Sequence, residues 1–188
     1  MPMQLLAHPD SAAGPVRGID AWAARTRDGY LQLTWRLEAE LSRLHIPAAT
    51  ITAGMPARAD GLWRHTCFEV FVSAVHSSAY RELNFSPSGE WAAYGFTAYR
   101  AGMAPLDLPA PPVARWHRTP AELTLEVVLS IDDLLPGLGS GPLRLALAAV
   151  IEDASGTLSY RALRHPPGKA DFHHPEAFAL ELTDTAAA

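Results

Sequence analysis

The chain has 188 residues, of which 48% are hydrophobic and 19% are charged, and its net charge is −5 at pH 7. This length supports one sizeable core and is short for two full domains, and the composition is that of a folded globular protein. Lys169 is the only lysine and the sequence contains no run of basic residues, which argues against a nucleic-acid-binding protein.

The N-terminal residues 1–15 lack the basic and apolar regions of a secretory signal, and no stretch approaches the ~20 apolar residues of a membrane span. Cys67 is the single cysteine, so no intrachain disulfide can form, and this is consistent with a protein of a reducing compartment. We therefore expect a cytoplasmic protein.

The first expected element is a β-hairpin around Asp28-Gly29, because both positions of this pair accept the positive φ of a tight two-residue turn. Apolar and polar residues alternate over 31–41 after the turn, which is the period of a half-buried strand. Leucines four residues apart in this segment would also suit a helix, but Thr34 and Trp35 favour the strand.

Three short strands follow a loop at 47–63 that is rich in glycine and proline. Alternating side chains predict these strands at 66–75, 80–86 and 91–99. Because strands joined by short turns are usually neighbours in a sheet, we predict an antiparallel meander.

A proline-rich connector at 105–112 interrupts the pattern without the change of composition that marks a domain boundary. Further strands are expected beyond it, with a turn or short helix at 132–141 and a loop at 165–174. These strands lie at 123–131, 143–151, 157–163 and 178–182. Nine or ten short strands with few long helices predict an all-β chain, folded over residues 1–188 as one jelly-roll-like antiparallel β-sandwich domain.

Three segments taken together resemble a known family. They are residues 60–69 with Leu-Trp and Cys-Phe-Glu, residues 80–94 with Asn-Phe-Ser-Pro-Ser-Gly-Glu-Trp, and residues 160–172 with His-Pro-Pro-Gly-Lys. This pattern resembles the DOMON-like domains, in particular the bacterial branch named after its association with MurB-type reductases, which is grouped with type 9 carbohydrate-binding modules. The resemblance implies a jelly-roll-like sandwich whose relatives bind sugars or haem, although relatives that share one fold differ in ligand.

The first candidate polar set joins the loop residues Trp63, Arg64 and His65 to Glu69 on the following strand. An indole can stack on the apolar face of a pyranose, while arginine and glutamate can hydrogen-bond its hydroxyls. Alternatively, this loop caps the core, with Trp63 covering it and Arg64 paired with a carboxylate.

The second set is the strand face that carries Tyr80, Glu82, Asn84 and Ser86. Polar residues at every second position usually form a solvated outer face, but they can also line the concave side of a jelly roll. If the strands of Glu69 and Glu82 are neighbours, the two carboxyls could flank a glycosidic bond, as in a glycoside-acting enzyme.

The third set is a loop that contains His165, Lys169, Asp171, His173 and His174. Three interpretations stay open for it, namely a metal site, a grip on an anionic or hydroxyl-rich ligand, and an ordered loop in which Asp171 accepts backbone amides. The spacing of these groups matches no known metal motif, so no metal ligand is assigned.

The sequence therefore predicts a non-catalytic module that binds a small carbohydrate or a sugar-containing metabolite. The residues expected to bind the ligand are Trp63, Arg64, His65, Glu69, Glu82, Asn84, His165, Lys169, Asp171 and His173. This hypothesis requires the three sets to meet on one face of the molecule.

Two alternatives stay open. One is a glycoside-acting enzyme that uses Glu69 and Glu82, and the other is a haem- or metal-binding domain, for which Met103 and His65 are available as axial ligands. No cofactor is assigned, neither nucleic acid nor a membrane is expected as a partner, and the oligomeric state stays open.

Overall fold

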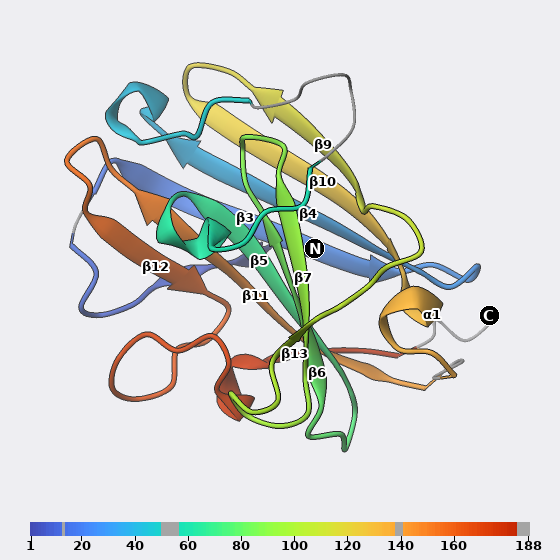
Figure 1. Ribbon diagram of the computed structural model, residues 1–188. Coiled ribbons are helices and arrows are strands. Elements are labelled where there is room, and N and C mark those ends of the chain that lie inside the picture. Colours follow the sequence, from blue (N-terminus) through green and yellow to red (C-terminus); the bar gives the residue numbers. More distant parts are fainter. Residues whose placement is uncertain (13, 50–56, 138–140, 184–188) are drawn as a thin grey trace.

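Two antiparallel sheets pack face to face in the computed structural model of the chain, which describes residues 1–188 except 13, 50–56, 138–140 and 184–188 (Figure 1). The strand order is β1-β3-β4-β10-β9 in the first sheet and β2-β12-β11-β5-β6-β7-β8 in the second, where β13 also pairs with β11. The predicted all-β antiparallel sandwich is thus confirmed.

The first sheet is built around the predicted hairpin. Its strands are β1 (Met3–Gln4), β3 (Val16–Arg25), β4 (Tyr30–Ala39), β9 (Val113–Arg118) and β10 (Glu122–Ser130). Gly29 has a φ of 83° in the turn between β3 and β4, a conformation that glycine adopts without strain. The expected positive φ at Asp28 is wrong, because the turn is longer than two residues and needs this conformation at Gly29 but not at Asp28. Buried and solvent-facing residues alternate along β4, so the strand interpretation of this segment is confirmed up to Ala39. The 3-10 helix η1 (Leu41–Arg43) follows.

The second sheet contains the predicted meander as β5, β6 and β7. Its strands are β2 (Leu6–Ala7), β5 (Cys67–Ala74), β6 (Tyr80–Phe85), β7 (Trp91–Phe96), β8 (Ala104–Pro105), β11 (Leu143–Glu152), β12 (Leu158–Ala162) and β13 (Leu180–Leu182). β7 ends earlier than expected because a turn begins after Phe96, in which Arg100 adopts a φ of 52°.

Three short helical turns complete the described chain. They are η2 (Leu62–Arg64), α1 (Ile131–Leu134) and η3 (Pro175–Ala177). None of the helices that the structure describes has the length and apolar character needed to traverse a membrane.

Strand β9 was not expected from the sequence, and neither were the two-residue strands β1, β2 and β8. β9 lies at the edge of the first sheet, pairs with β10 alone, and has no buried residue. Its two inward apolar side chains, Ala114 and Trp116, are only partly buried against the main core, so the alternation in its sequence is short and weak.

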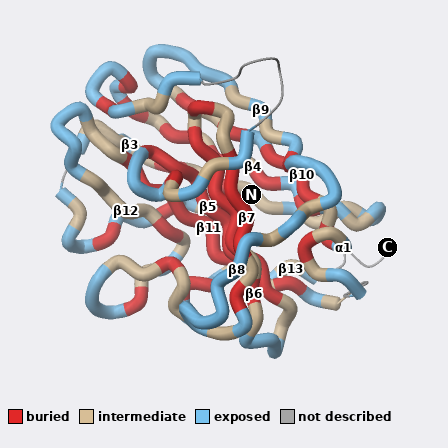
Figure 2. The backbone as a smooth tube through the Cα atoms, viewed as in Figure 1, coloured by how far each residue is buried: buried red, intermediate tan, exposed pale blue. Residues whose placement is uncertain are grey.

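The two sheets differ in the burial of their outer faces. The inner faces of both sheets form the main core, with Trp35, Phe68 and Phe85 among its largest fully buried side chains. The outer face of the second sheet is also buried, so that β5 is buried on both faces from Cys67 to Ser73 (Figure 2). The covering elements are η2 and residues 163–179, here called the covering loop, which contribute Leu62, Phe172 and Phe178.

The main core gives a first prediction. Leu125 on β10 is fully buried, and Leu125→Ala should lower the free energy of unfolding by about 2–5 kcal/mol, because it removes apolar contacts and leaves a cavity. The matched control is Leu6→Ala, since the side chain of Leu6 is 53% exposed and its loss should change stability by less than about 0.5 kcal/mol. Urea unfolding of the two variants measures the difference, and equal effects would contradict this assignment of the core.

Candidate functional site

A pocket of about 470 Å³ lies on the outer face of the second sheet, between η2 and the covering loop. Its aromatic wall consists of Trp63, Phe96, Tyr160 and Phe172. Its polar lining consists of Arg64, Glu69, Glu82, Arg100 and His173. Apolar wall and polar floor therefore meet in one concavity.

The pocket brings together members of all three predicted sets. These members are Trp63, Arg64, Glu69, Glu82 and His173. Asn84 lies beside the floor, where its Nδ2 donates a hydrogen bond to Oε1 of Glu82 at 2.8 Å. The condition that the sets converge on one face is thus met by these six residues.

Four other predicted residues do not line this pocket. They are His65, His165, Lys169 and Asp171. Nδ1 of His65 lies 2.6 Å from Oε2 of Glu152, and Nε2 of His165 donates to the carbonyl of Leu6 at 2.9 Å. Lys169 is exposed on the covering loop. Met103 lines the pocket while His65 does not, so the two residues considered as haem ligands do not share its wall.

Asp171 anchors the covering loop. Its carboxylate accepts hydrogen bonds from the hydroxyl of Tyr99 at 2.5 Å, from the guanidinium of Arg100 at 2.8 Å and from the backbone N–H of His173 at 3.1 Å. Burial acts to raise the pKa of Asp171, but the bonds from Arg100 and Tyr99 outweigh it and lower the pKa below its ordinary value. Asp171 thus accepts a backbone amide, as the ordered-loop interpretation expects.

Arg100 was not predicted as a site residue, although it joins the pocket lining to the anchor of the covering loop. It stands 71 residues before Asp171 in the sequence and occupies a turn rather than a patterned strand. Nothing in the local sequence marks it, because its role depends on the packing of a distant loop.

Strands β5 and β6 place two glutamates on the floor of the pocket. Their register pairs Glu69 with Asn84 and Phe71 with Glu82, so both carboxyls lie on the same face of neighbouring strands. Glu69 is 3% exposed and Glu82 5% exposed. The second set is therefore not the solvated outer face that such alternation usually produces.

Burial controls the protonation of this pair. Burial raises the pKa of Glu69 well above its ordinary value, and the charge of Glu82 raises it further. Burial also raises the pKa of Glu82, although the hydrogen bond from Asn84 opposes this change. Glu69 is thus the carboxyl that holds a proton more readily. Oε1 of Glu69 and Oδ1 of Asn84 are both buried without a hydrogen-bond partner, which leaves bonding capacity at the floor.

His173 closes the pocket beside Glu82. The hydroxyl of Tyr80 accepts the backbone N–H of Arg100 at 3.2 Å and lies 2.9 Å from Nδ1 of His173. The other ring nitrogen of His173, Nε2, lies 3.8 Å from Oε2 of Glu82. Burial, assisted by the charge of Arg100, lowers the pKa of His173 to about 4, so the imidazole is neutral at pH 7.

Trp63 is held in place while part of its indole stays open to solvent. Its side chain is 37% exposed and meets the ring of Tyr94 edge-on, with ring centroids 5.9 Å apart. The hydroxyl of Tyr94 in turn donates to Asp60 at 2.6 Å. Leu62, rather than Trp63, supplies the buried contact of η2, so the indole is available to a ligand.

Comparisons with known proteins identify the class of fold. A scan against protein-family models and a search of curated proteins find no match. Among solved structures, the chain is similar to a protein of Bacteroides uniformis described as a candidate carbohydrate-binding protein, with a TM-score of 0.70 and 15% identity over 97% of this chain and 84% of that one.

Two further similar structures are family 9 carbohydrate-binding modules from Caldicellulosiruptor kristjanssonii. One, in complex with cellotriose, has a TM-score of 0.52 and 10% identity over 99% of this chain and 87% of that chain. The other, in complex with glucose, has a TM-score of 0.50 and 11% identity over 92% and 78%. The protein therefore has the β-sandwich fold of these modules. Its placement in the DOMON-like, MurB-associated branch stays a prediction.

The shifted pKa of His173 gives a prediction for stability against pH. Between its ordinary pKa of 6.5 and its folded pKa of about 4, the unfolded chain binds a proton at His173 and the folded chain does not. Stability should therefore fall as the pH falls through this window, by on the order of 3 kcal/mol from this group. His173→Phe keeps an aromatic ring but removes this contribution, so in urea unfolding at stepped pH the stability difference between the variant and the unmodified protein should change by this amount across the window.

The control for this experiment is His117→Phe, because the side chain of His117 is 68% exposed. This variant should keep the pH dependence of the unmodified protein. Parallel profiles for the unmodified protein and His173→Phe would contradict the assignment of a buried, neutral imidazole.

Proposed function

We propose that this protein binds a small carbohydrate or a sugar-containing metabolite in the pocket between η2 and the covering loop, without chemical turnover. The observation that carries the proposal is the buried carboxyl of Glu69, which has an unpartnered oxygen at the floor of a pocket with an aromatic wall. Sugars combine hydroxyls that both donate and accept hydrogen bonds with C–H faces that pack on aromatic rings, and they match both parts of this lining.

The size and charge of the pocket support a small neutral ligand. Its volume of about 470 Å³ falls in the range of small-molecule sites. Arg100 is paired with Asp171, and the raised pKa of Glu69 favours its neutral form, so neither group gives the pocket a strong field that would favour an anion or a cation. The resemblance of the fold to modules crystallised with glucose and cellotriose supports the same ligand class.

The proposal assigns different roles to the predicted residues. Ligand contact is assigned to Trp63, Arg64, Glu69, Glu82 and His173, which line the pocket. Asn84 positions the carboxyl of Glu82 through a hydrogen bond, and Asp171 anchors the covering loop through a bond from its backbone. His65, His165 and Lys169 are not assigned to the ligand, because they lie outside the lining.

Replacement of Trp63 tests the proposal. Calorimetric titration of the full chain with a panel of mono- and oligosaccharides, including glucose and cellotriose, should detect binding of at least one member. Trp63→Ala should then weaken that binding about 3- to 10-fold, because the aromatic face that packs on the sugar ring is lost. The matched control is Trp22→Ala, since Trp22 lies on the first sheet against Arg36, away from the pocket.

Two outcomes would count against the proposal. One is that no sugar of the panel binds with a Kd below about 1 mM. The other is that Trp22→Ala and Trp63→Ala weaken binding equally, since a sugar in this pocket contacts only the second of these indoles.

The second candidate function is glycoside hydrolysis by Glu69 and Glu82. The raised pKa of Glu69 favours it, because a general acid must hold its proton near neutral pH. The same enzyme also needs an ionised partner, and burial raises the pKa of Glu82 as well, which favours binding over catalysis. Release of the aryl group from aryl glycosides, abolished by Glu69→Gln, would establish the enzyme. Sugar binding with no turnover in the unmodified protein would exclude it for those substrates.

A further inference from the structure

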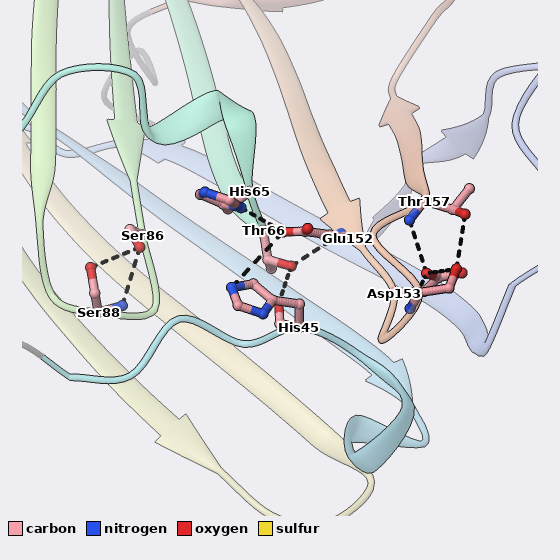
Figure 3. A network of polar contacts seen from close by, with 9 residues as sticks. His45, His65, Thr66, Ser86, Ser88, Glu152, Asp153 and Thr157 are labelled. Carbon is pink, nitrogen blue, oxygen red and sulfur yellow. Dashed lines mark hydrogen bonds and ion pairs between the residues drawn. The ribbon is translucent and has the colours of Figure 1, made fainter.

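We propose that His45, His65 and Glu152 form a binding site for a transition-metal ion, with Zn²⁺ as the expected ion, outside the lining of the sugar pocket. One ligand atom of each residue lies within 4.8 Å of the others. Oε2 of Glu152 is 2.6 Å from Nδ1 of His65 and 3.9 Å from Nε2 of His45. Figure 3 shows the two imidazoles directed toward this carboxylate.

The spacing of the ligand atoms suits a small ion. Two ligands bound to a tetrahedral Zn²⁺ lie about 3.4 Å apart, since each bond is about 2.0–2.1 Å long. The distances of 2.6 Å and 3.9 Å fall on either side of this value. Both imidazoles are on half-exposed side chains, 50% for His45 and 57% for His65, so small rotations suffice to bring them to bonding distance.

The buried residue Thr66 already fixes the backbone segments that carry His45, His65 and Glu152. Its hydroxyl donates to the carbonyl of His45 at 2.6 Å and accepts the backbone N–H of Glu152 at 3.1 Å. The N–H of His45 also donates to the carbonyl of Glu152 at 2.9 Å. A metal ion would therefore order only side chains, and the entropic cost of binding would be small.

The chemistry of the ligand set selects the class of ion. Two imidazoles and one carboxylate suit Zn²⁺ and its neighbours in the first transition row, whereas Ca²⁺ and Mg²⁺ prefer sites built from oxygen ligands. Three protein ligands leave a fourth position for water or another small ligand, and the exposure of both histidines keeps that position accessible. Among the residues that the structure describes, this is the one such group of histidine, cysteine and acidic side chains.

A bound ion would fasten η2 to the end of β11. His65 is the C-cap residue directly after η2, and Glu152 is the last residue of β11. The expected consequence is a more stable fold in the presence of metal, which does not depend on whether the pocket binds a sugar.

Metal titration of the full chain, prepared without an affinity tag and stripped with a chelator, tests the proposal. Calorimetry with ZnCl₂ should show one ion per chain with a Kd of about 10 µM or tighter, and the thermal midpoint should rise with the Zn²⁺ concentration. CaCl₂ and MgCl₂ should do neither. His45→Ala, His65→Ala and Glu152→Gln should each weaken Zn²⁺ binding at least 10-fold.

The chain offers a matched control in His117→Ala. His117 is an exposed histidine 3.9 Å from Glu126, so it reproduces the histidine–carboxylate pair without the second imidazole. This variant should bind Zn²⁺ as the unmodified protein does. The proposal is overturned if Zn²⁺ does not bind at one per chain, if Ca²⁺ binds equally tightly, or if the three ligand variants retain full affinity.

Discussion

The organisation of this protein depends on the burial of both faces of its second sheet. A sandwich of two sheets needs one apolar face on each, and the first sheet follows this rule, with solvent-facing residues opposite the core along β4. The second sheet departs from it because η2 and the covering loop pack on its outer face. The polar residues of β5 and β6 are thereby desolvated, and the altered protonation of Glu69 and Glu82 follows from that cover.

The cover is itself held by polar contacts, and these separate the residues that hold the cover from the residues that we propose to bind the ligand. Asp171 has its hydrogen bonds satisfied by Tyr99, Arg100 and a backbone amide, and its pKa is lowered. Glu69 is buried with an unpartnered oxygen, and its pKa is raised. A satisfied carboxylate stabilises a loop, whereas an unsatisfied one costs stability and is retained where a ligand can complete it.

Much of the fold could be predicted from the sequence, because apolar alternation marks strands whose pattern comes from the core. This applies to β4, β5 and β6, whereas the edge strand β9 has only partly buried apolar residues and so leaves a weak signal. The site could be predicted only in part. Local patterns marked Glu69 and Glu82 as candidates. Their meeting on the floor of one pocket depends on the register between β5 and β6, which the alternation of side chains does not specify. Arg100 and Glu152 have no local signal, since each meets its partner across 71 or 87 residues of chain.

The segment from η2 into β5 shows how one short stretch can serve several functions. Leu62 is buried against the outer face of the second sheet, Trp63 and Arg64 enter the pocket lining, and His65 turns to Glu152. Successive residues leave a tight 3-10 turn in different directions, so four neighbours can reach the core, the pocket and a separate polar cluster. The position of Trp63 is therefore determined on one side by Tyr94 and on the other by the contacts of His65 and Thr66 with β11. An indole restrained in this way would lose little entropy on contact with the proposed ligand.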